Sequence, residues 1–204
     1  MVPMITALML CNVGRRAVIV GGSIAAHTSA VNVPRAAART PGSSDLRQSI
    51  EQIKDARAAL QKLRDEWSTY AVIDAEGRAG NIDAARRILG GVAPQRGDAA
   101  IEVAKVTPLY RIDGAFAAVR KAALASDGTS WGSALDVDAF VEQGEDIVFA
   151  LKRADDSFYG VVFASKGSQQ LAKIYGEARD SVDLSLRGFD SILSLLKESG
   201  APGL

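Results

Sequence analysis

A glycine pair behind a short apolar run is the first stretch that could bind a ligand, as a nucleotide-binding loop. The stretch is RRAVIVGGSIAAHTSA, residues 15–30. A dinucleotide loop follows the pattern G-x-G-x-x-G/A, in which a glycine lets the backbone approach the pyrophosphate, but Ser23 stands at that position. Pro34 also ends any helix that could receive the phosphates. The sequence therefore predicts no dinucleotide site here.

Acidic residues gather in the second half of the chain, where carboxylates could hold a metal or act as acid and base. They are Glu142, Glu145, Asp146, Asp155 and Asp156. A di-metal centre inside a helical bundle also uses Glu-x-x-His pairs, and no histidine stands near these acids. We therefore expect a solvated acidic face, with no metal, no cofactor and no catalytic residue among them.

The N-terminal segment has the features of a targeting leader. Arg15 and Arg16 precede an uncharged run that ends at Ala30, and an A-x-A site follows at 36–38. This is the pattern of a cleavable twin-arginine export signal. We expect cleavage after Ala38, which leaves a single domain over residues 39–204. The alternatives are cleavage after Ala30 or a frayed N-terminus with chance arginines.

Loss of residues 1–38 would change what chemistry the chain can perform. The only histidine, His27, and the only cysteine, Cys11, both lie in this segment. Ser-His and Cys-His nucleophiles and zinc sites would then be excluded, so we expect a protein that is not an enzyme. The segment also holds three basic residues and no acid, whereas the whole chain has 24 of each sign. The remaining slight acidity argues against a nucleic-acid partner.

The elements that must position the remaining residues are helices, because apolar residues recur every three or four positions from Ser44 onward. The expected helices cover about 44–70, 82–89, 98–125, 136–162 and 171–196. Pro108 should kink or split the helix expected over 98–125. Four long amphipathic segments with short connections predict an all-α domain, an antiparallel up-down-up-down four-helix bundle with a short extra helix between helices one and two.

Each expected helix has an apolar stripe that should face the core. In the first helix the stripe runs from Leu46 to Tyr70, and in the helix after Asp136 it includes Val148 and Val162. Several glycines lie inside the helices, where they lower helix propensity. Because a glycine allows a close approach, we expect Gly114, Gly144, Gly160, Gly176 and Gly188 to mark tight helix contacts.

Basic residues are the candidate docking groups. Arg86, Arg87, Arg120 and Lys121 should lie away from the apolar stripes, and Arg111 should line the break at Pro108. Such cations could meet acidic patches of a partner protein, where exposed charges steer association. The alternative for each of them is an ordinary solvated helix face.

Two segments and the first apolar stripe resemble the PsbQ-type extrinsic subunits of photosystem II and their algal relatives. The segments are NIDAARRIL, residues 81–89, and YGEARDSVDLSLRGFDSILSLL, residues 175–196. The resemblance covers about residues 46–196. It implies a subunit in the chloroplast thylakoid lumen, peripheral to the membrane, that docks on the photosystem core beside other extrinsic subunits. It also implies that the subunit shields the water-oxidising cluster and helps to retain calcium and chloride.

Other functions remain open from the sequence. One is a lumenal subunit of photosystem I, or a linker between core and antenna. A second is a freestanding helical protein that binds a small ligand between its helices. An enzyme built on lysine, tyrosine or carboxylates is a third, and it would require paired charges inside the core.

Overall fold

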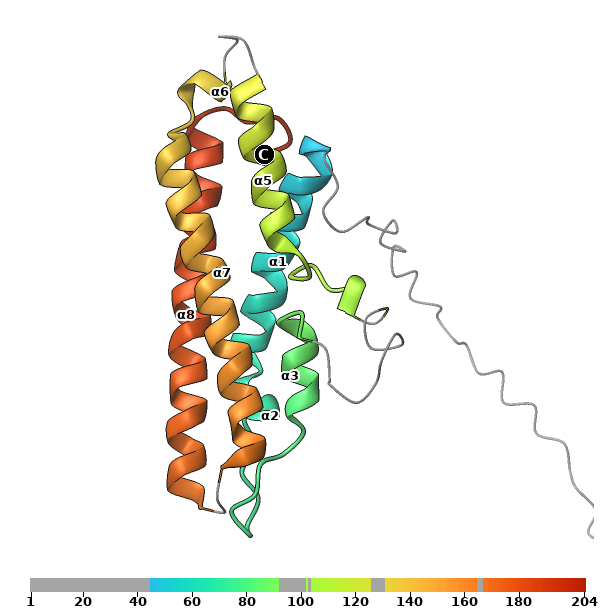
Figure 1. The fold of residues 1–204 in the computed structure, drawn as a ribbon, viewed down its shortest axis with the longest axis vertical. Coiled ribbons are helices and arrows are strands. Elements are labelled where there is room, and N and C mark those ends of the chain that lie inside the picture. The colour runs from blue at the N-terminus through green and yellow to red at the C-terminus, as the bar shows by residue number, and fades with distance from the viewer. Residues whose placement is uncertain (1–44, 92–101, 103, 126–130, 165–166) are drawn as a thin grey trace, which may run out of the picture. The chain divides into compact units, whose positions relative to one another are not determined.

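The computed structural model describes residues 45–91, 102, 104–125, 131–164 and 167–204, and these residues belong to one compact unit. The expectation of an all-α chain is confirmed for this part, where the only β-type pairing is an isolated bridge between Ile73 and Ala79. The proposed leader, residues 1–38, lies outside the described residues. The elements in Figure 1 are α1 (Leu46–Asp65), α2 (Trp67–Tyr70), α3 (Ile82–Ile88), α5 (Ile112–Ala125), α6 (Trp131–Ala134), α7 (Val137–Gly160), the 3-10 turn η1 (Val161–Phe163) and α8 (Ser168–Glu198).

Short polar side chains begin three of these helices. The Asp45 carboxylate accepts a hydrogen bond from the Gln48 amide at 2.8 Å, and Asp136 accepts one from the Ala139 amide at 3.0 Å. Asn81 does the same for α3. A side chain that satisfies a free amide of the first turn stabilises a helix by about 1 kcal/mol. Asp45 therefore caps α1.

The long helices pack against one another in pairs. α7 packs along α8, α5 packs against both α1 and α7, and α1 also packs against α8, while α3 lies against α7 and α1. Figure 1 shows α7 and α8 side by side over most of their length. Phe116 links these elements, because its ring contacts Phe140 of α7 and Phe189 of α8, both with centroids 6.1 Å apart.

The core stripes of α1 and α8 are confirmed. In α1 the five positions from Ile50 to Leu63 at three- and four-residue steps are fully buried, and Leu46, Trp67 and Tyr70 pack partly buried against them. In α8 the positions from Leu171 to Leu196 form the matching stripe. In the described part of the chain, every buried side-chain nitrogen and oxygen has a hydrogen-bond partner. These helices therefore bury apolar surface without leaving polar groups unsatisfied.

Two inward positions that we expected near α7 are wrong. Val148 is 36% exposed, because the buried positions of α7 include Gly144, Ile147 and Leu151, and Val148 lies one residue, about 100°, beyond that face. Val162 is 60% exposed. It follows the end of α7 at Gly160 and lies in η1, where the α-helical period no longer applies.

The expected break at Pro108 is confirmed. Turns separate this proline from α5, which begins only at Ile112. The buried Gln52 of α1 holds the break in place, since its amide nitrogen donates to the carbonyls of Pro108 at 3.0 Å and Tyr110 at 3.1 Å. Arg111 enters α5 with φ 52°, a left-handed conformation that is uncommon for a residue other than glycine.

Two of the helix glycines mark close approaches, as expected. A Cβ on Gly188 would lie 2.6 Å from Ile147 Cγ1, and one on Gly144 would lie 3.3 Å from the Phe116 ring. The expectation is wrong for Gly160 and Gly176, because a Cβ on either would meet nothing within 4 Å. The close packing of α7 on α8 at Gly188 and on α5 at Gly144 therefore uses the missing side chain.

Candidate docking groove

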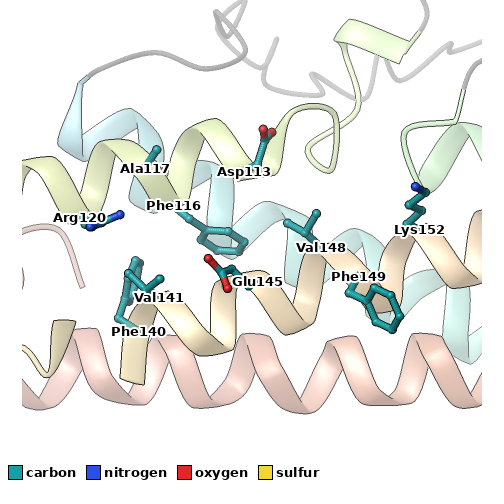
Figure 2. A pocket seen from close by; sticks show the side chains of 11 residues that line it. Asp113, Phe116, Ala117, Arg120, Phe140, Val141, Glu145, Val148, Phe149 and Lys152 are labelled. Atoms are coloured by element: carbon teal, nitrogen blue, oxygen red, sulfur yellow. The ribbon is translucent and has the colours of Figure 1, made fainter. Parts of the chain in front are cut away.

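A groove of about 390 Å³ runs between α5 and α7. Phe116 and Phe140 form part of its apolar lining (Figure 2), and Gly144 also lines it. Each helix contributes one acid and one base to the rim, Asp113 and Arg120 from α5 and Glu145 and Lys152 from α7. We call this hollow the α5/α7 groove.

The sequence explains why the groove is open. Gly144 and Ala117 carry little or no side chain at the point where α7 and α5 approach each other. Two larger apolar side chains of α7 also line the groove, and they remain in contact with solvent: Val148 is 36% exposed and Phe149 is 62% exposed. Adjacent exposed apolar residues beside a concave surface are typical of a recognition site.

A second hollow, of about 230 Å³, continues the groove toward α3. The two hollows share Asp113, Val148 and Lys152 in their linings. Arg111 and Asp155 line the second hollow, together with the glycines that end α3. The joined surface therefore extends along α7 from Phe140 to Asp155.

The end of α3 is built by two glycines. Gly90 has φ 86°, and its amide donates to the Arg87 carbonyl at 3.2 Å, while the Gly91 amide donates to the Arg86 carbonyl at 2.7 Å. This is the Schellman pattern, in which a left-handed glycine satisfies the last carbonyls of a helix. Gly91 also makes room for α7, because a Cβ there would overlap the Asp155 carboxylate.

Arg86 of α3 is bound to Asp155 of α7 by two hydrogen bonds. Arg86 Nε lies 2.9 Å from Asp155 Oδ1, and Nη2 lies 3.1 Å from Oδ2. The guanidinium also lies over the Tyr159 ring, 4.8 Å from its centroid. The hydrogen bond to Asp155 raises the pKa of Arg86 above its ordinary value. A paired arrangement of this kind fixes the position of α3 on α7.

The expectation that Arg86 lies away from the apolar stripe is wrong. Its residue surface is only 8% exposed, and its charge is directed to Asp155. Arg87 is half-buried, while Arg111, Arg120 and Lys121 are exposed as expected. The structure brings Arg111 and Arg120 to the two joined hollows, whereas Arg87 and Lys121 line neither.

The expected solvated acidic face is confirmed for Glu142, Glu145, Asp146 and Asp156, which are exposed. It is wrong for Asp155, whose carboxylate side chain is 23% exposed and paired with Arg86. Among the described residues, no three or more His, Cys, Asp or Glu side chains come together in a group that could hold a metal ion.

Sequence reasoning missed Gly91 and Phe149 in this region, and Gln52 at the break near Pro108. It also missed that Asp155 pairs with Arg86. Two adjacent glycines after a short helix are typical of a helix end, but nothing in the sequence marks Gly91 as a gap for a carboxylate. Phe149 stands one position outside the stripe that the periodicity picked out. A large apolar residue outside the expected stripe, Phe149, is the sequence signal that could have indicated the groove.

The arrangement of the α5/α7 groove is suited to binding. The groove offers apolar contacts and four rim charges of balanced sign. Within the described residues, no helix has the length and apolar character needed to cross a membrane. Compared with protein-family models, with curated proteins and with solved structures, the chain has no match.

Proposed function

We propose that this protein is a non-enzymatic extrinsic subunit on the lumenal face of a photosynthetic membrane complex, in the first place photosystem II. In this role it shields the oxygen-evolving side and helps to retain calcium and chloride. The proposal rests on the resemblance of residues 81–89 and 175–196 to PsbQ-type subunits. In the structure these segments correspond to α3 with its Asn81 cap and to most of α8.

The single observation that carries the non-enzymatic part is the filled interior of the described helices. Phe140, Phe158 and Phe189 are fully buried together with the aliphatic stripes. The buried polar residues of this interior other than Arg86, such as Gln52 and Ser185, are bound to backbone carbonyls, and Arg86 is paired with Asp155 at the contact of α3 with α7. A core of this kind leaves recognition to the outer faces of the helices.

The proposed fold is an up-down-up-down antiparallel four-helix bundle of α1, α5, α7 and α8, with α3 as the extra short helix. The packing of α1 on α5, α5 on α7, α7 on α8 and α8 on α1 supports it, since each helix has two neighbours among the four. In Figure 2, Asp113 lies toward the Lys152 end of α7 and Arg120 toward the Val141 end. This order supports opposite directions for α5 and α7.

Docking in this proposal uses exposed cations against acidic lumenal loops of the complex. Arg111, Arg120 and Lys121 remain candidates, and Arg87 is a weaker one because it is half-buried. Arg86 is no longer a candidate, since Asp155 already binds its guanidinium. Charges at the edge of an interface mainly set the association rate and its dependence on salt.

The test is release and rebinding on isolated thylakoid membranes. Concentrated salt should release the protein, because salt screens exposed charges. The double variant Arg120→Glu/Lys121→Glu should rebind several-fold more weakly than the unmodified protein. Arg111→Asn should also rebind more weakly, and asparagine tolerates the positive φ at this position. Lys173→Glu, an exposed position on α8, is the control and should rebind normally.

Retention in concentrated salt, or equal rebinding of all variants, would contradict docking through these charges. A native gel separates the two photosystems as hosts: migration with photosystem I would assign the protein to that complex or to its antenna link.

The α5/α7 groove favours a second candidate, a helical protein that binds a small apolar ligand. Its volume of about 390 Å³ falls within the usual size of ligand sites, roughly 300–1,000 Å³. Purification from membrane-free extract with a small molecule bound in the groove would favour this function. A ligand-free protein found only on membranes would count against it.

A further inference from the structure

The outer face of α7 carries a symmetric pattern of residues. Val148 and Phe149 stand at its centre, both exposed. Glu145 stands three positions before Val148, and Lys152 stands three positions after Phe149. All four side chains line the α5/α7 groove, and Figure 2 shows the two apolar residues between the acid and the base. The four positions are therefore symmetric about the point between Val148 and Phe149, with the acid on one side and the base at the matching position on the other.

From this pattern we infer that the protein forms a homodimer in which the α7 helices of two copies pack antiparallel along their α5/α7 grooves. The twofold axis then passes between Val148 and Phe149. Val148 of each copy faces Phe149 of the second copy, and Glu145 of each copy faces Lys152 of the second copy. Closed twofold dimers are the commonest assemblies of a single chain, because one self-complementary patch serves both partners.

The charges of the groove support a second copy as its occupant. In the described part of the chain, the side chains of Glu145 and Lys152 make no ion pair or hydrogen bond. On α5, Asp113 and Arg120 repeat the balance of one acid and one base seven residues apart. A partner of a single charge sign would meet repulsion at two of the four rim positions. A second copy instead places each α7 base opposite an α7 acid.

Shape supports the same occupant. Phe149 projects from the groove lining, so in this register each copy packs an exposed apolar side chain against the exposed Val148 of the second copy. α7 has 24 residues and is therefore about 36 Å long, which allows antiparallel contact over several turns. The inference does not rest on the proposed function, but a second copy and a small ligand would compete for the α5/α7 groove, and Arg120 lines that groove as well as being a docking candidate.

The experiment is sedimentation equilibrium of the full chain over a wide range of protein concentration. The unmodified protein should show the mass of a dimer at the higher concentrations. Phe149→Glu should remain folded, because the residue is 62% exposed, but it should be monomeric. Leu184→Glu is the matched control: Leu184 is 45% exposed on α8 and does not line the groove, so the dimer should persist.

A charge exchange tests the register. Lys152→Glu should raise the dimer dissociation constant by about tenfold or more, since two attractive pairs become repulsive. Glu145→Lys should do the same. The double variant Glu145→Lys/Lys152→Glu should return the constant to within about threefold of the unmodified value. A purely structural role for either residue would not give this recovery.

A monomeric mass for the unmodified protein at all concentrations would overturn the inference. A dimer that survives Phe149→Glu, or that the double exchange fails to restore, would also overturn it by placing the interface or its register elsewhere. A monomeric protein that binds vesicles or a different protein through Phe149 would also overturn the inference and would assign the groove to that other occupant.

Discussion

The ion pair between Arg86 and Asp155 should be a major contributor to stability. It joins α3 to α7 across 69 residues of sequence, through two hydrogen bonds of 2.9 and 3.1 Å. The change we consider is Asp155→Asn, which keeps the size of the side chain and removes its charge. Arg86 would then remain in place with its side chain only 10% exposed and without its counterion.

The expected magnitude follows from burial. A hydrogen bond to a charged group contributes about 1.5–3 kcal/mol, and removing one partner of a fully buried pair costs about 3–5 kcal/mol. Because the Asp155 side chain is 23% exposed, water compensates part of the loss. We therefore expect the free energy of unfolding to fall by about 2–3 kcal/mol.

The chain contains a matched control for this change. Arg57 and Asp190 also pair at 2.9 Å, but their side chains are 34% and 56% exposed. Asp190→Asn should cost less than about 1 kcal/mol. The measurement is urea unfolding followed by far-ultraviolet circular dichroism at neutral pH. Our argument is that the burial of an ion pair determines how much it stabilises the protein. Equal losses in the free energy of unfolding for Asp155→Asn and Asp190→Asn would refute it.

A double-mutant cycle isolates the pair itself. Arg86→Met combined with Asp155→Asn should lose less than the sum of the single losses, with a coupling energy of about 1 kcal/mol or more. Additive losses would mean that the two side chains do not stabilise each other. The Arg86–Asp155 pair would then not explain how α3 is held on α7.

Other positions give matched tests of packing, capping and titration. In α8, Gly188→Ala should destabilise the protein by about 1–3 kcal/mol because its Cβ would meet Ile147, whereas Gly176→Ala should be neutral or stabilising by up to about 1 kcal/mol; thermal unfolding measures both, and equal effects would contradict the packing. In α1, Gln52→Ala should lower the free energy of unfolding by about 1–3 kcal/mol, because the Pro108 and Tyr110 carbonyls lose their donor. Gln61→Ala, at a more exposed position, should lower it by less than about 0.5 kcal/mol. Urea unfolding compares the two variants, and similar losses would exclude a role for Gln52 at the break near Pro108. Burial raises the pKa of Tyr175 above its ordinary value of 10.0, so the folded state holds this proton more tightly than the unfolded state. The contribution of the Tyr175 proton to the free energy of unfolding is therefore full below about pH 10 and falls as the pH rises beyond that value. Tyr175→Phe should lose less stability than the unmodified protein between about pH 9.5 and 11. Parallel curves of unfolding free energy against pH would contradict this assignment.

The core of the long helices could be predicted because its signal is local. Ile50 to Leu63 and Leu171 to Leu196 repeat at helical spacing, and burial follows directly from that repeat. The break near Pro108 was also local, since proline lacks an amide hydrogen. The end of α1 at Asp65 carries no such signal, and the expected single helix to Tyr70 is in fact α1 followed by α2.

The candidate site could be predicted only in part because its geometry depends on distant residues. Arg86 has the sequence context of a surface residue, and only the approach of Asp155 on α7 explains its burial. Val148 lies at the edge of the buried face of α7, so the apolar period alone could not decide whether α5 covers it and the neighbouring Phe149. Arg120 and Lys121 were placed correctly outside, since their neighbours in α5 define its buried face.

The most direct test of the account is to find the native complex that contains this protein. Thylakoid membranes would be solubilised gently and separated on a native gel, and each band would be analysed for this chain by mass spectrometry. We expect the protein in the photosystem II band, with its mature N-terminus near Arg39, and we expect it to leave that band after a salt wash. Its recovery only as a free protein with an intact Met1 would contradict the proposed function.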